Sequence, residues 1–142
     1  MRLDTSTHIH PAILKIQRLL RKIDNLQLPD SSQHEVERIL VRQVTSELDR
    51  ALPSQQGHGR RTAVLAVGIG TIAGLSQKNL HHLTLGSLLH DIGLLTIPPH
   101  LFLERHPLDA EAYVAMQCHP RIGAELLEPF PFLREASVLI AH

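Results

Sequence analysis

Apolar residues along this chain recur at the three- and four-residue spacing of one helix face, and this periodicity constrains the fold more than any other feature. No sustained alternation of apolar and polar residues, the pattern typical of a half-buried strand, accompanies it. We therefore predict an all-α protein. The clearest apolar stripe consists of Ile13, Ile16, Leu19, Leu20 and Ile23.

Proline, glycine and serine clusters divide the periodic pattern into about six helices. Ser31 or Ser32 is the predicted N-cap of the second helix, and Asp109 that of the fifth. Pro120 is predicted to kink or divide the fifth helix, because proline removes a backbone donor. The predicted helices run from Pro11 to the break at Pro29, from about Gln33 to Leu52, from near His58 to about Gly74, from after Ser76 to near Ile92, from near Asp109 to about Glu128, and from Pro131 to the last residue.

Size and charge narrow the classes of function. The 142 residues suit one domain, and the 14 Lys and Arg residues balance the 14 Asp and Glu residues. This balance lacks the basic footprint of a nucleic-acid binder, so duplex nucleic acid is not an expected partner. Cys118 is the only cysteine, which excludes an intrachain disulfide and a cysteine-based zinc site.

The chain divides by composition at about residue 52. Residues 1–52 hold six of the 11 Arg residues and half of the Gln and are predicted to form a helical lead-in, whereas residues 53–142 are predicted to form the core that carries the chemistry. The N-terminus has no apolar signal core, and the longest uncharged stretch, residues 62–77, is shorter than the roughly 20 residues that a bilayer span needs. We expect a cytoplasmic protein without a membrane partner, and a homodimer stays open.

Eleven histidines are the unusual feature of the composition. If the third and fourth helices form an antiparallel hairpin, His58 at its start and His90-Asp91 at its end lie at the same height, because about 16 residues out and about 14 back nearly cancel. The last two helices repeat this relation for His119 and His142. These side chains can therefore converge on one metal site, although a histidine in a helical protein also occurs simply as a surface or core residue.

The adjacent His90-Asp91 pair is the most informative part of this set. Neighbouring residues on a helix point about 100° apart, so both can contact metal only at a helix end that borders a cleft. Asp91 has two oxygens and could bridge two ions, which would lower the pKa of a bridging water and polarise a phosphate. We expect one or two divalent ions of Fe, Mn, Zn, Ni or Co, with His90 and Asp91 as the catalytic residues.

The order of motifs in the second half resembles the HD-GYP subgroup of the HD superfamily of metal-dependent phosphohydrolases. The resemblance runs from about His58 to His142. It is carried by His90-Asp91-Ile92-Gly93 with Ile97-Pro98, by Leu108-Asp109-Ala110-Glu111 through Met116, by His119-Pro120-Arg121-Ile122-Gly123-Ala124-Glu125-Leu126-Leu127, and by Pro131-Phe132-Leu133-Arg134-Glu135-Ala136.

The resemblance implies a helical bundle of the HD-domain type and a ligand for each matching position. His58 matches the first family ligand, His90 and Asp91 match the HD pair with Asp91 as the bridge, His119 matches the next histidine, and His142 matches the first of a His-His pair. It also implies hydrolysis of a phosphodiester, most characteristically cyclic di-GMP. Two alternatives stay open: a catalytically inactive signalling module with the same fold, and an HD enzyme that hydrolyses nucleotides.

The chain also departs from the subgroup. Leu94 stands where the family has a lysine, and Glu104 with Arg105-His106 occupies the region of a second lysine. Ser54 replaces the glutamate that supplies a third metal, so we expect at most two ions. The second histidine of the pair, the Gly-Tyr-Pro loop and a later aspartate lie beyond His142, which suggests a fragment or a divergent short form.

Two further pairs of basic residues occur near this set in the sequence. His81-His82 lies about two turns from His90 and is expected at the surface or in a partner contact rather than as a ligand. Arg60 and Arg61 follow His58 and either meet a phosphate or occupy a solvated helix start.

Overall fold

The computed structural model describes residues 9–27, 29–99, 101 and 110–142, and in these residues it contains helices and no strand. The prediction of an all-α bundle of about six helices is confirmed. The α-helices are α1 Ala12–Asp24, α2 Asp30–Ala51, α3 His58–Ile72, α4 Gln77–Leu89, α6 Ala110–Leu127 and α7 Arg134–Ala141, and the short 3₁₀ turns are η1 Pro53–Gln55, η2 Ile92–Thr96 and η3 Pro131–Leu133.

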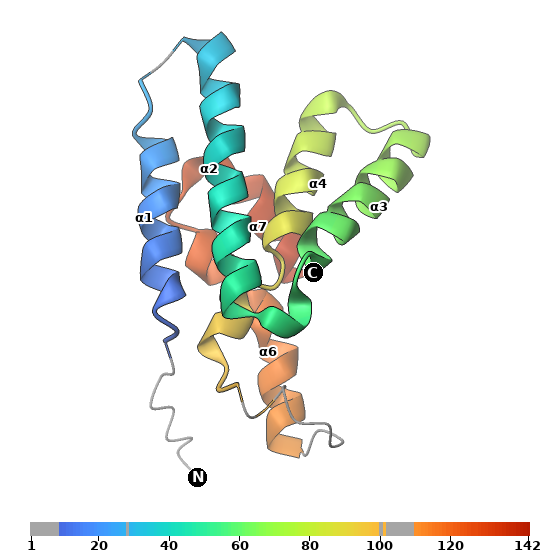
Figure 1. Cartoon of the computed structure of the whole chain (residues 1–142). Helices are drawn as coiled ribbons and strands as arrows, with labels where there is room; N and C mark the ends of the chain where they lie inside the picture. The colour runs from blue at the N-terminus through green and yellow to red at the C-terminus, as the bar shows by residue number, and fades with distance from the viewer. Residues whose placement is uncertain (1–8, 28, 100, 102–109) are drawn as a thin grey trace.

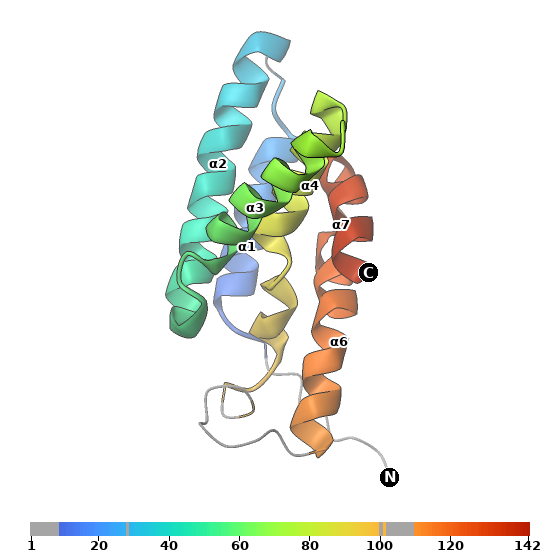
Figure 2. The ribbon, with the colours of Figure 1, turned by 90° about the vertical axis from the view of Figure 1, so that its right-hand side faces the viewer.

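The helices form layers around α4 and η2. Antiparallel α1 and α2 lie on one side and α6 with α7 on the other, while α4 and η2 run between them (Figure 2). Helices α3 and α4 form an antiparallel hairpin, and its turn at residues 73–76 points away from the bundle (Figure 1). Their other ends, where α3 begins and α4 stops, meet at the middle of the bundle.

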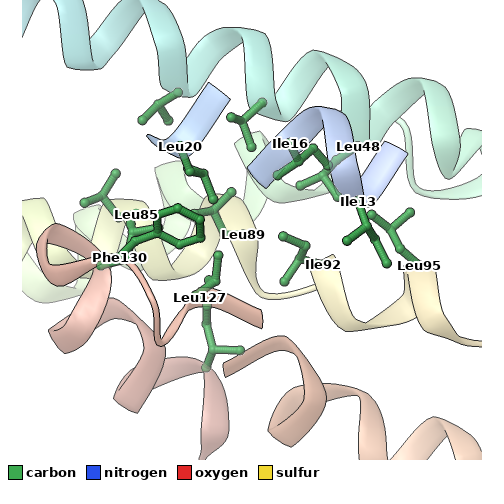
Figure 3. Packing of buried hydrophobic residues seen from close by; sticks show 14 of the residues in the cluster. Ile13, Ile16, Leu20, Leu48, Leu85, Leu89, Ile92, Leu95, Leu127 and Phe130 are labelled. Carbon is green, nitrogen blue, oxygen red and sulfur yellow. The ribbon is translucent and has the colours of Figure 1, made fainter. Parts of the chain in front are cut away.

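One apolar core joins these layers. Figure 3 shows Ile16 and Leu20 of α1 facing Leu89 of α4, with Leu127 and Phe130 closing the opposite side. Each fully buried side chain of this size stabilises the fold by about 1.5–3 kcal/mol relative to an exposed one. Because α1 and α2 contribute to this core, the predicted lead-in packs directly against the rest of the described chain.

The start of α2 and the end of α4 differ from the sequence-based expectation, whereas the predicted start of α4 after Ser76 is confirmed. Helix α2 begins at Asp30 and not at Gln33, so Ser31 and Ser32 lie inside its first turn and not before it. The extended ψ of 144° at Pro29 already sets the chain up to enter the helix there. Helix α4 begins after the Ser76 cap, whose hydroxyl accepts a hydrogen bond from Asn79 N, 3.2 Å away.

Helix α4 stops at Leu89, short of the expected end near Ile92, and the chain tightens into η2. This early stop leaves His90 and Asp91 at a helix end. Pro120 does not divide α6, which is continuous from Ala110 to Leu127. The predicted cap Asp109 lies outside the described residues, and no described helix is both long and apolar enough to cross a bilayer.

Candidate metal centre

Side chains from three elements converge where α3 begins and α4 ends, at the end of the hairpin opposite its turn. His58 is the first residue of α3, His90 is the C-cap of α4, and Asp91 follows it. Their neighbours Leu89 and Ile92 are 0% and 1% exposed. Burial on both sides fixes the backbone of the His-Asp pair, so both polar side chains are held at the edge of the core.

The donor atoms of these residues lie at the spacing that a shared ion requires. His58 Nε2 is 3.1 Å from His90 Nε2 and 3.7 Å from Asp91 Oδ2, and His90 Nε2 is 3.3 Å from Asp91 Oδ1. Two ligands that each lie about 2.0–2.2 Å from one metal ion are roughly 3–3.5 Å apart. The nitrogen and oxygen donors therefore fit a divalent transition metal.

His119 of α6 also approaches the carboxylate of Asp91. Its Nε2 lies 3.7 Å from Asp91 Oδ1, the oxygen that also faces His90. Asp91 Oδ2 faces His58 instead. The two carboxylate oxygens of Asp91 thus face different histidines.

The ring of His90 is oriented by the end of its own helix. His90 Nδ1 lies 2.9 Å from the carbonyl oxygen of Ser87. A carbonyl oxygen only accepts, so Nδ1 must carry the proton and donate it. The last carbonyls of a helix lack backbone partners, and Ser87 is one of these residues. Nδ1 of His90 donates to this free carbonyl oxygen, and the lone pair of Nε2 therefore points toward the cluster.

The ring of His119 is oriented in the same way. His119 Nδ1 lies 2.6 Å from the carbonyl oxygen of Met116, three residues earlier in α6. Nδ1 is again the donor, and Nε2 again faces Asp91. Two histidines from different helices therefore present unprotonated Nε2 atoms to one carboxylate when their rings are neutral.

The contact between His58 and His90 follows from this assignment. With the proton of His90 on Nδ1, its Nε2 holds a lone pair 3.1 Å from His58 Nε2. Two lone pairs at that distance repel unless a cation or a proton lies between them. His58 Nε2 therefore either donates its proton to His90 or shares an ion with it.

Two glycines permit the close backbone approach that gathers the cluster. A Cβ at Gly59 would lie 2.9 Å from the carbonyl oxygen of Leu88, so α3 passes directly over the end of α4. A Cβ at Gly93 would overlap the carbonyl oxygen of His119, so η2 lies directly on α6. Any side chain at either position would separate the elements that bring the ligands together.

A pocket borders the cluster between the end of α2 and the start of α3. His90 and Asp91 line it together with Asp49 and Arg60. Asp49 Oδ1 accepts a hydrogen bond from Gly57 N at 2.8 Å, and its other oxygen pairs with the Arg60 guanidinium. The sequence alone does not decide whether Arg60 contacts a phosphate or solvent, and no motif marks Asp49. The left-handed turn at Gly57, with φ of 70°, brings the start of α3 beside Asp49.

The remaining predicted residues lie apart or contact no ligand. His142 is the exposed residue that follows α7, and no described hydrogen bond or ion pair joins it to the cluster. Leu94 is 2% exposed in the core, which excludes a phosphate contact from that position. Ser54 is exposed in η1. The segment with Glu104 and Arg105-His106 lies outside the described residues.

Known proteins resemble the part of the chain that holds this cluster. A family model described as HD domain matches residues 42–142. The cyclic di-GMP phosphodiesterase response regulator RpfG of Xanthomonas campestris pv. campestris (strain 8004) is 32% identical over 101 residues, which cover 68% of this chain. The match spans 26% of that relative. No solved structure matches the chain.

Proposed function

The chain belongs to the HD domain family, and from this premise we propose that it is a metal-dependent phosphohydrolase that cleaves a cyclic dinucleotide such as cyclic di-GMP. The observation that carries the proposal is the convergence of His58, His90 and Asp91, whose donor atoms all lie within 4.8 Å of one another. The similarity to a cyclic di-GMP phosphodiesterase supports the choice of substrate.

The proposed ligands are these three residues with His119, and His142 is a further ligand by family resemblance alone. One or two divalent ions bound there would polarise a phosphate and lower the pKa of a bound water. One oxygen of Asp91 lies nearest His58 and the other nearest His90 and His119, which suits a bridging position. The carbonyls of Ser87 and Met116 fix the rings of His90 and His119, so these ligands need no reorientation.

Arg60 is the proposed phosphate contact. It lines the pocket with His90 and Asp91, and the carboxylate of Asp49 holds its guanidinium in place. A guanidinium has five N–H donors, so the pairing with one carboxylate oxygen leaves donors free for a phosphate oxygen. Arg60 thereby supplies a positive charge that buried Leu94 cannot supply.

A steady-state assay with three substrates tests the proposal. The chain is supplied with Mn²⁺ or Fe²⁺ and incubated with cyclic di-GMP, with a nucleoside triphosphate and with the generic diester bis(p-nitrophenyl) phosphate. We expect cleavage of cyclic di-GMP that Asp91→Asn abolishes, whereas the exposed α6 variant Glu125→Gln keeps it. Cleavage of the triphosphate alone would favour the HD nucleotide hydrolase.

A non-catalytic signalling module is the second candidate. Buried Leu94 in place of the family lysine favours it, because the fold could keep its metal ligands without a substrate contact. Its signature is a protein that binds metal and cyclic di-GMP and cleaves none of the three substrates. That result would reject the hydrolase and retain the family assignment.

A further inference from the structure

Pro120 follows a proposed metal ligand inside a helix, a place where proline is costly. The helix α6 is continuous from Ala110 to Leu127, so Pro120 removes one backbone hydrogen bond without ending the helix. In an α-helix the N–H of residue 120 would donate to the carbonyl of residue 116. Proline has no N–H, so the carbonyl oxygen of Met116 loses this partner.

The His119 ring uses the acceptor that Pro120 leaves free. His119 Nδ1 lies 2.6 Å from the Met116 carbonyl oxygen, which puts the imidazole proton on Nδ1. Its Nε2 then has the lone pair and lies 3.7 Å from Asp91. The same ring-to-carbonyl contact at His90 uses the carbonyl of Ser87, which is free because α4 ends at Leu89. A helix end does for His90 what a proline does inside α6 for His119.

We propose that Pro120 is a positioning residue that sets the tautomer and orientation of His119 by withholding a backbone N–H from Met116. This inference rests on the proposed metal-binding function. An N–H at position 120 would compete for the Met116 oxygen, release Nδ1 of His119 and allow the proton to move to Nε2. The ring would then face Asp91 with a donor in place of the lone pair that a metal needs.

The direct readout is the tautomer of His119 in the metal-free protein. Nitrogen-15 chemical shifts of the ring distinguish Nδ1–H from Nε2–H, and we expect the Nδ1–H form in wild type. Pro120→Ala restores the donor and should move His119 toward the Nε2–H form. Pro131→Ala, at the start of η3, is the matched control and should leave the His119 ring unchanged.

The metal affinity gives a second, independent readout. Pro120→Ala should weaken Mn²⁺ or Zn²⁺ binding about 10- to 100-fold, the usual effect of removing a group that orients a ligand. Its melting temperature should not fall, because alanine is a better helix residue than proline. Weaker metal binding in an equally stable protein is an outcome that a purely structural role for Pro120 does not produce.

An ester at position 120, introduced as the α-hydroxy acid related to alanine, separates the missing N–H from the missing ring. It has the side chain of alanine but no N–H, so it should restore both the Nδ1–H tautomer and the affinity. Pro120→Ala with an unchanged His119 tautomer would overturn the inference. Because the tautomer is read without metal, this result is decisive even if wild type binds no ion, and a wild type without metal would refute only the proposed function.

Discussion

Gly93 lies with its bare Cα against the backbone carbonyl of His119, and no side chain fits between them. This contact sets how closely η2 approaches α6, and it therefore sets the distance between Asp91 and His119. Glycine here is required for close approach and not for an unusual backbone angle.

Gly93→Ala should consequently destabilise the protein and loosen the site together. Overpacking a close contact typically costs about 1–3 kcal/mol. Gly68→Ala is the matched control, because a Cβ there meets no atom within 4 Å and alanine in the α3 interior should stabilise the helix by roughly 0.5–1 kcal/mol. Urea unfolding of both variants checks this, and equal stability changes of the same sign would refute the packing account.

Arg60→Ala should impair catalysis without unfolding the chain. A lost hydrogen bond to a charged group is worth about 1.5–3 kcal/mol, so we expect kcat/KM for cyclic di-GMP to fall roughly 10- to 100-fold. The neighbouring Arg61 bonds to the carbonyl of Gln56 and does not line the pocket. Arg61→Ala is therefore the control, and equal losses in both variants would contradict the assigned role of Arg60.

His81 should make part of the stability depend on pH. Its Nε2 lies 2.9 Å from Glu37 Oε1, and this hydrogen bond raises the pKa of His81 above its usual value, with desolvation opposing the shift. The other titratable rings beside it are His34 and His82.

A raised folded-state pKa stabilises the fold fully below the unfolded pKa, about 6.5, and this stabilisation is lost as the pH rises through the folded-state value. The free energy of unfolding of His81→Gln should thus be lower than that of wild type by less than about 1 kcal/mol at pH 5.5, as expected for a partly exposed pair. The two free energies should become equal at alkaline pH. Urea titrations at several pH values measure this, with His82→Gln as the control. A constant difference between wild type and His81→Gln would count against the ion pair.

The sequence predicted the fold class, which the structure confirms, and it predicted the residues of the candidate site for identifiable reasons. Helical periodicity, the break at Gly57 and the breaks at Gly74 and Ser76 define the α3–α4 hairpin. Because its two arms have similar lengths, the hairpin returns His90 to the height of His58. The His-Asp pair could be assigned to a helix end because two adjacent side chains converge only there.

Other features depend on tertiary contacts that no local pattern records. Asp49 reaches the pocket only because the turn before His58 folds α3 back over the end of α2. Helix α4 ends early where η2 packs on α6 through Gly93, a tertiary contact that local propensity does not record. The role of Pro120 likewise appears only when the His119 ring is seen on the Met116 carbonyl.

The central claim is that His58, His90, Asp91 and His119 together hold metal, and elemental analysis of the purified chain tests it most directly. Wild type supplied with Mn²⁺, Fe²⁺ or Zn²⁺ and then desalted should retain about one to two ions per chain. His90→Ala and Asp91→Ala should retain almost none, while Glu125→Gln should match wild type. A metal-free wild type, or variants that retain as much metal as wild type, would contradict the account.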